Sequence, residues 1–382
     1  MMFEETKRFC DTFLEKGMPG FDLMVMKDGK EVLRYKNGFS DAERGIPVRG
    51  NERYNIYSCS KVMTCVAAMQ LWEKGLFSLD DRLSDYMPEF EKMNVATENG
   101  VRPAKRPILI HNLFEMTAGF TYDCSTGNIQ TAKEETGGRC QTREFMKYYA
   151  RDPLAYEPGD EWRYSLGHDV LAAFVEVISG QKFEEYVKET IFDPLGMKDS
   201  TFLLPESERK NVAPLYRYNK ETGRADLLGT PVPEYVFGSE YASGGAGVVS
   251  TVEDCMKFAE GVRLRKIIKD GTVELMKTDR LTEKERPYYW NKTDYGYGLG
   301  VRCAKKDGFF RDYGWGGAAG AYLAIDDERG LSLYFASHML SSPLRRFRPY
   351  IYRFVCAELF ETEDPAELFK KSEIRSPDDY RF

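Results

Sequence analysis

Hydrophobic and polar residues alternate along residues 21–39, on both sides of the Asp28-Gly29 dipeptide. A period of two is typical of strands with one buried face, and Asp-Gly favours a tight hairpin turn. Residues 1–20 carry apolar side chains among acids and bases in the pattern of an amphipathic helix. The chain is therefore predicted to begin with a helix and a β-hairpin.

A helical period begins at Ser58 and continues as far as Gly75. Its apolar face would be made of Val62, Cys65, Val66 and Met69. Glycine often follows the last turn of a helix, so Gly75 marks the end. Strand-like sequence precedes this helix and its apolar face is pronounced, which predicts a central position in the fold.

The rest of the chain divides into a strand-rich end and a helix-rich middle. The expected strands near the C-terminus, followed by a final helix, cover residues 296–303, 308–314, 320–330, 331–339 and 344–360. Helical periods separated by loops with Pro and Gly fill the middle. The simplest architecture is an α+β fold with an antiparallel sheet from both chain ends (1–78 and 236–382), flanked by helices. A mostly helical subdomain (79–235) would be inserted between them and form a cleft at the seam.

Composition narrows the classes of partner. The 382 residues carry a net charge of -7, with lysines and arginines scattered among more numerous acids. Phosphate binding needs clustered basic side chains, so nucleic acid is excluded and a small-molecule or peptide partner is expected. No run approaches the roughly 18 apolar residues of a membrane span, and the N-terminus lacks a signal-peptide pattern.

The number and spacing of the cysteines bear on whether the protein works in a reducing or an oxidising compartment. Eight cysteines are spread along the chain without CxxC pairs. This pattern suits reduced thiols better than a disulfide framework or a zinc site, so a cytoplasmic location is expected. The sequence also shows no metal-ligand cluster and no phosphate-binding loop, so we expect no cofactor.

Ser58 and Lys61 stand three residues apart at the start of the central helix. This spacing puts them on one face, where a helix N-terminus offers backbone N–H groups and positive potential to a developing oxyanion. A serine hydroxyl needs a neighbouring base to become a nucleophile. A lysine can serve only where burial or nearby charge favours its neutral form. Ser58 could equally be a helix cap, and Lys61 a solvated charge.

Two other S-x-x-K matches act as internal controls. Ser179 and Lys182 flank a helix stop at Gly180, and Ser207 and Lys210 lie in a charged stretch without an apolar face. Neither pair is expected to build a buried site. A serine activated by histidine is an alternative with three candidates, none of them in a G-x-S-x-G elbow: His111, His168 and His338.

With these residues the chain resembles the serine β-lactamase and penicillin-binding-protein superfamily, in the branch shared by class C β-lactamases, D-amino peptidases and β-lactamase-like carboxylesterases. The resemblance extends from about residue 20 to residue 335 and implies a β-lactamase/transpeptidase-like fold. Beyond Ser58-x-x-Lys61, the segments that carry it, in the family's order, are residues 18–30, 74–90, 108–120, 157–171, 243–259, 295–301 and 313–320.

The family's second motif, Y-x-N, corresponds to Tyr164-Ser165-Leu166. The resemblance implies that Tyr164 is the general base or proton relay, and a cationic Lys61 beside it would stabilise a phenolate. Leu166 departs from the motif, because leucine cannot hydrogen-bond a substrate amide as asparagine would. This departure weakens the case for β-lactam or peptide recognition.

The family's third motif, Lys-Thr-Gly or His-x-Gly, corresponds to Trp315-Gly316-Gly317. The N–H of Ala318 would share an oxyanion hole with the N–H of Ser58, and glycines let this backbone approach a substrate closely. Trp315 offers an apolar wall where lactamases and D-peptidases carry a polar or cationic group. Trp315 could also be a core residue.

The resemblance therefore favours a serine hydrolase that forms an acyl-enzyme on Ser58, in particular a carboxylesterase for small esters. Two rivals from the same class are a β-lactamase or D-alanyl peptidase, and a histidine-assisted esterase. A noncatalytic ligand-binding descendant is the alternative from a different class. Phe120 and Tyr122, which border the expected cleft, could shape an acyl pocket or simply pack.

Overall fold

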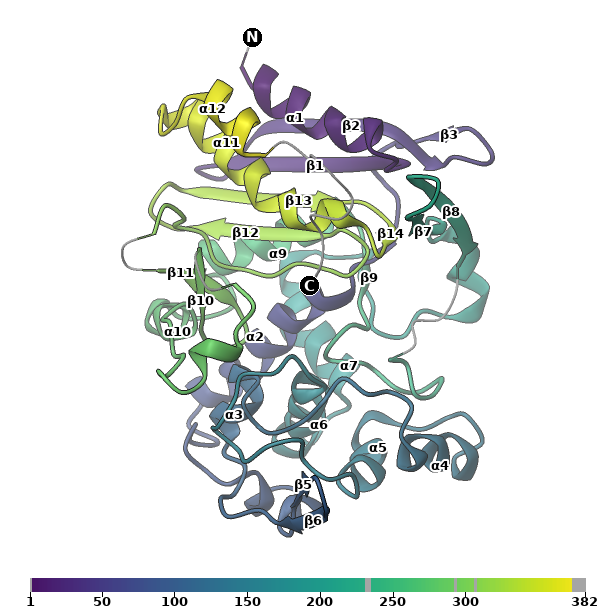
Figure 1. The fold of residues 1–382 in the computed structure, drawn as a ribbon, viewed down its shortest axis with the longest axis vertical. Helices are drawn as coiled ribbons and strands as arrows, with labels where there is room; N and C mark the ends of the chain where they lie inside the picture. The colour runs from purple at the N-terminus through teal and green to yellow at the C-terminus, as the bar shows by residue number, and fades with distance from the viewer. Residues whose placement is uncertain (1, 231–234, 292–293, 306–307, 373–382) are drawn as a thin grey trace.

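The computed structural model describes residues 2–230, 235–291, 294–305 and 308–372 (Figure 1). Its main sheet has five strands in the order β12-β13-β1-β2-β3, and neighbouring strands are antiparallel. The strands are β1 (Gly20–Lys27), β2 (Lys30–Asp41), β3 (Ile46–Pro47), β12 (Tyr322–Asp326) and β13 (Leu331–Ala336). The antiparallel sheet built from both chain ends is thus confirmed.

The predicted hairpin forms between β1 and β2, with Lys27 opposite Lys30. Both turn residues have positive φ, 51° at Asp28 and 77° at Gly29. A two-residue turn of this kind matches the twist of the strands, and Asp-Gly adopts it at low cost. A local sequence signal therefore fixes the register of the first strand pair.

Helices cover both faces of this sheet. On one face, α1 (Glu4–Glu15) and α11 (Arg348–Phe360) pack with Phe21 and Phe335 in one hydrophobic cluster. On the other, α9 (Val252–Arg263) packs with Met24 and Tyr334 in a larger cluster. Because both faces are covered, the first six positions of β1 are all buried. A short α12 (Pro365–Lys371) follows α11.

The central helix is α2 (Ser60–Glu73), which runs through the middle of the molecule (Figure 1). A 3₁₀ turn, Tyr57–Cys59, precedes it, so Ser58 lies just before the α-helix. The helix is buried on nearly every side, against α6 (Gly167–Ser179) among others, rather than on one face alone. It ends before Gly75, whose φ is 70°.

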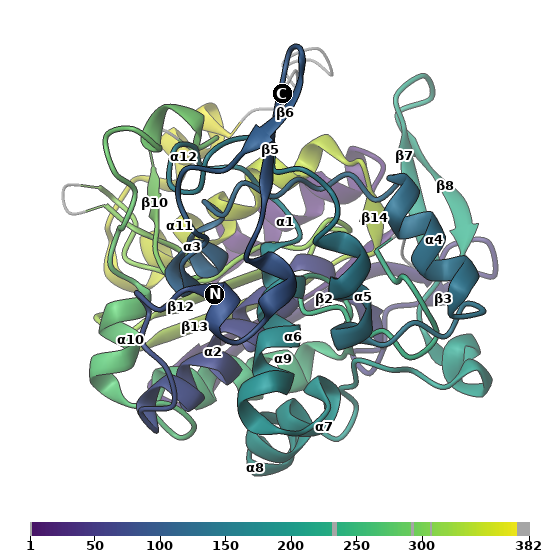
Figure 2. The ribbon, with the colours of Figure 1, turned by 90° about the horizontal axis from the view of Figure 1, so that it is seen from below.

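The middle of the chain is mainly helical and also contains two hairpins, which project from the body in Figure 2. In the second hairpin, β7 (Leu215–Asn219) pairs with β8 (Arg224–Gly229), and β14 (Met339–Leu340) joins β7 in parallel, so strands from distant parts of the sequence share a sheet. The subdomain boundaries at 78/79 and 235/236 stay a prediction. The elements of this segment are β5 (Asn94–Thr97), β6 (Gly100–Pro103), α3 (Ile110–Glu115), α4 (Gly127–Glu135), α5 (Thr142–Tyr149), α7 (Phe183–Val187), α8 (Asp193–Leu195), β7 (Leu215–Asn219) and β8 (Arg224–Gly229).

The remaining elements of the described chain are short. They are β4 (Tyr54–Asn55), β9 (Val249–Ser250), α10 (Asp270–Met276), β10 (Tyr295–Tyr297) and β11 (Arg302–Ala304).

Three expectations for the C-terminal part were wrong in detail. The single strand expected at 296–303 is instead the antiparallel pair β10–β11. The described residues between 308 and 314 form no strand beyond isolated bridges of Tyr313 and Gly314, and Asp312 bonds Arg302 and Tyr295. The helix expected at 344–360 is α11, which begins at Arg348 after a 3₁₀ turn at Pro343–Phe347, since Pro349 is tolerated only in the first turn of an α-helix.

Candidate active site

Ser58 sits on a strained turn at the head of α2. The preceding residue, Tyr57, has a φ of 51°, a left-handed conformation that costs a non-glycine residue about 1–3 kcal/mol. Its ring is buried beside Leu215 and Ala319 and meets Tyr235 edge to face at 5.8 Å. This packing holds the turn, and Ser58 itself remains 8% exposed.

Lys61 reaches Ser58 from within the core. Its Nζ lies 3.4 Å from Ser58 Oγ and donates to the carbonyl oxygen of Gly245 at 2.6 Å. The side chain is fully buried, and its Nζ lies 4.6 Å from the centre of the Tyr164 ring. Among the described residues no carboxylate forms an ion pair with Lys61. The S-x-x-K pair is thus a buried contact, not a solvated charge beside a cap.

Asp169 is a buried acid in the electrostatic environment of Lys61. Burial raises the pKa of Asp169, while the positive charge of Lys61 acts in the opposite direction. Its Oδ1 accepts hydrogen bonds from Tyr241 at 3.0 Å and from Ser243 at 2.7 Å. None of these residues was predicted to belong to the site, although Asp169 and Ser243 lie in segments that carry the family resemblance.

The ring of Tyr164 also packs against the Lys61 ammonium group. Its hydroxyl accepts a hydrogen bond from Trp315 Nε1 at 3.3 Å. Its ring stacks on Tyr122, with centroids 5.3 Å apart and planes within 3°, and lies 5.0 Å from the ring of Trp290. The structure thus brings Lys61, Tyr164 and Trp315 together, and it makes Trp315 a hydrogen-bond donor as well as an apolar wall.

The Trp315-Gly316-Gly317 segment runs next to the Ser58 turn. Cys59 Sγ lies 3.6 Å from the carbonyl oxygen of Trp315, and Ala318 packs on the cluster that contains Tyr57. Gly316 bridges to Tyr322, the first residue of β12. Within the described ranges, neither the Ser58 N–H nor the Ala318 N–H has a protein acceptor. Two backbone donors are therefore available near the serine.

The two aromatic residues of the expected cleft loop behave differently. Tyr122 joins the cluster, where its ring centre lies 5.3 Å from Lys61 Nζ. Phe120 is buried against Phe90 and Tyr149 and belongs to the core. Sequence reasoning also missed Trp290, which is 55% exposed and stacks 6.0 Å from Trp315.

Leu166 lies at the N-cap of α6 and is completely buried in the larger hydrophobic cluster. Its side chain is therefore a packing residue. Where the Y-x-N motif has an asparagine amide, this chain has a leucine that packs in the core.

The histidines make their polar contacts elsewhere. His168 Nε2 lies 3.2 Å from the Phe114 carbonyl oxygen and 3.7 Å from Cys65 Sγ, and burial lowers the pKa of His168 to about 3. His338 Nδ1 bonds the Ala213 carbonyl oxygen at 2.9 Å. His111 pairs with a glutamate four residues along its helix. These contacts give no support to a histidine-assisted serine.

The two control S-x-x-K pairs are not buried sites. Ser207, Lys210 and Lys182 are exposed, and Ser179 is half-buried at the end of α6. The same spacing therefore yields a buried contact only at Ser58, where the surrounding chain supplies one.

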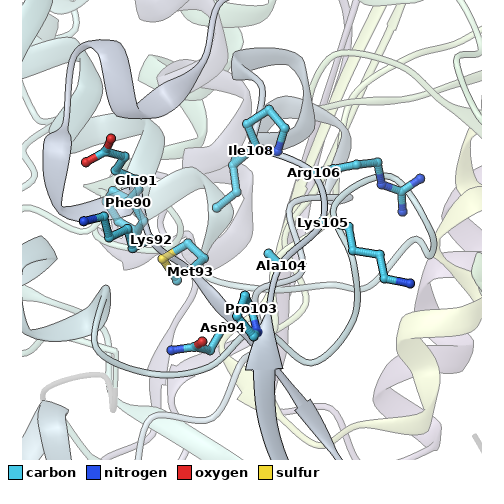
Figure 3. Close-up of a pocket in the computed structure, with 11 residues that line it drawn as sticks. Phe90, Glu91, Lys92, Met93, Asn94, Pro103, Ala104, Lys105, Arg106 and Ile108 are labelled. Atoms are coloured by element: carbon cyan, nitrogen blue, oxygen red, sulfur yellow. The ribbon is translucent and has the colours of Figure 1, made fainter.

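Other features of the described chain carry no catalytic geometry. A hollow of about 460 Å³ opens among residues 90–94 and 103–108, and neither Ser58, Lys61 nor Tyr164 lines it (Figure 3). No group of three His, Cys, Asp or Glu side chains in the described chain could hold a metal ion. No helix of the described residues has the length and apolar character that a membrane crossing requires.

Comparison with known proteins identifies the family of the chain. The family described as Beta-lactamase matches residues 6–356. Esterase EstB of Burkholderia gladioli is 27% identical over 368 residues, which cover 88% of this chain and 91% of that protein. Protein Rv1367c of Mycobacterium tuberculosis is 27% identical over 360 residues, covering 86% and 87%.

Solved structures share the fold. Simvastatin synthase (LovD) from Aspergillus terreus superposes with a TM-score of 0.77 at 22% identity, covering 94% of this chain and 98% of that one. The octameric penicillin-binding protein homologue from Pyrococcus abyssi gives 0.73 at 24% identity, covering 96% and 79%. The fold class expected from the sequence is confirmed. Because the family matches nearly the whole length, the chain belongs to the β-lactamase family of serine hydrolases.

Proposed function

We propose that the protein is a carboxylesterase that hydrolyses small esters through an acyl-enzyme on Ser58. The observation that carries the proposal is the buried contact of Lys61 Nζ with Ser58 Oγ at 3.4 Å, with the Tyr164 ring on the same ammonium group. This arrangement supplies a nucleophile and groups that can accept its proton.

In the proposed reaction Tyr164, assisted by Lys61, takes the Ser58 proton as Oγ attacks the ester carbonyl. The N–H groups of Ser58 and Ala318 stabilise the tetrahedral oxyanion, and the leaving alcohol is protonated through the same network. Tyr164 then takes a proton from a water molecule as the water oxygen attacks the acyl carbonyl, and this proton passes to Ser58 Oγ as the bond to the acyl group breaks and the acid leaves. Apart from substrate and water, each step uses groups of this chain alone.

The preference for an ester over a charged amide rests on the walls of the site. Trp315 stands where the family resemblance implies a polar or cationic group, and its indole N–H is directed to Tyr164. Leu166 is buried and offers no amide to a substrate. Trp290 and Tyr122 add aromatic surface. An uncharged, partly apolar substrate suits such a site, and the name of Esterase EstB points the same way.

A cytoplasmic location is part of the proposal. Its support is that all eight cysteines are free thiols, seven of them buried. Reduced cysteines without a disulfide framework are typical of reducing compartments.

The test is intact-protein mass after brief exposure to p-nitrophenyl butyrate and, separately, to nitrocefin, with colour release recorded alongside. We expect fast ester turnover, an acyl adduct that Ser58→Ala abolishes, and slow nitrocefin cleavage. Ser179→Ala is the matched control, because it removes the serine of an S-x-x-K pair that forms no buried site and should change neither ester turnover nor labelling. Fast nitrocefin turnover would move the protein to the β-lactamase side, and no adduct with either reagent would favour a noncatalytic binding protein.

A further inference from the structure

Arg348, the first residue of α11, inserts its guanidinium group behind the Trp315-Gly316-Gly317 segment. Its Nη1 donates to the carbonyl oxygen of Gly317 at 2.9 Å and also to that of Ala321. Its Nε donates to the Arg345 carbonyl oxygen at 3.0 Å. In the described part of the chain no carboxylate forms an ion pair with Arg348. The charge is thus directed at backbone oxygens.

Gly316 and Gly317 have no side chains, so Arg348 and the chain before Ser58 can both come close to their backbone. A Cβ on Gly316 would lie 2.9 Å from Arg348 Nη2, so a side chain there would displace the guanidinium group. A Cβ on Gly317 would lie 2.3 Å from the carbonyl oxygen of Ile56, just before the Ser58 turn. Gly317 is therefore held between Arg348 and the chain just before the Ser58 turn.

The Gly317 carbonyl and the Ala318 N–H belong to one planar peptide group and point in opposite directions. The Gly317 carbonyl oxygen also accepts the backbone N–H of Gly320 at 3.2 Å, so the charged donor of Arg348 adds to a turn in fixing the orientation of this plane. It also polarises the peptide, which strengthens the N–H as a donor on the other side. Burial and the neighbouring Arg345 lower the pKa of Arg348 to about 10, so the group is still cationic at neutral pH.

We propose that Arg348 is a positioning residue that orients and polarises the Gly317–Ala318 peptide, so that the Ala318 N–H serves as an oxyanion donor for chemistry at Ser58. The inference rests on the proposed function. It goes beyond it by giving a role to a residue that lies outside all three sequence motifs and touches neither the nucleophile nor the base.

The test compares Arg348→Ala with Arg353→Ala. Arg353 is on the same helix and pairs with Glu363, away from the Gly317 peptide, so it is the matched control. Two rates are measured for each protein: ester hydrolysis, as kcat and KM, and labelling of Ser58 by a fluorophosphonate, whose phosphoryl oxygen needs the same N–H donors. Guanidinium chloride at low-millimolar concentration is added as a rescue agent.

For Arg348→Ala we expect kcat and the labelling rate to fall together by about 10- to 100-fold, less than the 10²- to 10³-fold typical of losing a whole oxyanion donor. KM should change little, and guanidinium should restore part of both rates. Arg353→Ala should keep both. Wild-type rates in a folded Arg348→Ala variant would overturn the proposal, and so would a change in KM with kcat unaltered. Equal falls in kcat and labelling rate in Arg353→Ala would also overturn it.

Arg348→Lys covers the case in which the alanine variant does not fold. It keeps the charge but loses the planar fork, so an intermediate loss without guanidinium rescue is expected. Wild-type rates would overturn the inference. If wild-type protein is labelled at Ser58 but hydrolyses no ester, the proposed substrate class fails while the labelling rates still test Arg348. No labelling of wild-type Ser58 would overturn both.

Discussion

Replacing Lys61 with methionine separates the catalytic from the structural role of the buried ammonium group. Lys61 donates to the Gly245 carbonyl oxygen at 2.6 Å and lies 3.4 Å from Ser58 Oγ, and its side chain is fully buried. Methionine has a similar length and shape but no charge and no donor. The variant therefore fills the same space and removes only the polar function.

The expected loss of activity is large. A positioned group that transfers a proton, or supports the one that does, contributes about 10²- to 10⁴-fold in rate. At 1.36 kcal/mol per tenfold, this corresponds to about 3–5 kcal/mol of barrier. We therefore expect kcat/KM of Lys61→Met for p-nitrophenyl butyrate to fall by at least about 100-fold.

The expected change in stability is small. Burying an ammonium group costs several kcal/mol of lost hydration, and in the described chain Lys61 recovers this through hydrogen bonds, not through an ion pair. Hydrogen bonds to charged groups contribute about 1.5–3 kcal/mol each. Methionine removes the cost and the gain together, so the free energy of unfolding should change by no more than about 2 kcal/mol.

The assay is kcat/KM beside a thermal melt of the same preparation. Lys182→Met is the matched control, because Lys182 is the exposed lysine of the Ser179-x-x-Lys182 match. It should leave both quantities unchanged. A folded Lys61→Met that keeps more than a tenth of the wild-type kcat/KM would refute the assigned role. A variant that unfolds would instead make Lys61 a structural residue.

Three further results are expected. Tyr164→Phe, which removes only the hydroxyl, should lower kcat by about 10²- to 10⁴-fold while His168→Gln stays active; the reverse pair of results would favour the histidine mechanism. Leu166→Asn should lower the free energy of unfolding by about 2–5 kcal/mol in urea titration, because it buries an amide in the core, and faster nitrocefin turnover at unchanged stability would contradict this reading. Burial lowers the pKa of His338 to about 4, below its ordinary value of 6.5, so the unfolded chain binds the proton first and stability falls as the pH drops from about 6.5 to 4. His338→Gln should flatten this fall by up to about 1.4 kcal/mol per pH unit, and an unchanged slope between pH 4.5 and 7 would show that His338 does not titrate as a buried group.

Local patterns in the sequence determined the elements that depend on near neighbours. The alternation around Asp28-Gly29 gave the hairpin, because a two-residue turn with positive φ needs those residue types. The period from Ser58 to Gly75 gave the central helix, although not its burial on nearly every side. The start of α11 was predicted too early, because the prediction followed the apolar period and not the restriction that Pro349 places on an α-helix.

For the candidate site, the sequence supplied Ser58 and Lys61 through their spacing, and Tyr164 and Trp315 through a resemblance in motif order. The local context of each match also predicted that only the Ser58 pair would be buried. Only the tertiary structure decided that Trp315 donates to Tyr164 and that Arg348 reaches the Gly317 carbonyl oxygen. The physical reason is the range of the interactions. Turns and helix faces are set by residues a few positions apart, whereas these contacts join segments far apart in the chain, and neither a period nor a turn signal records them.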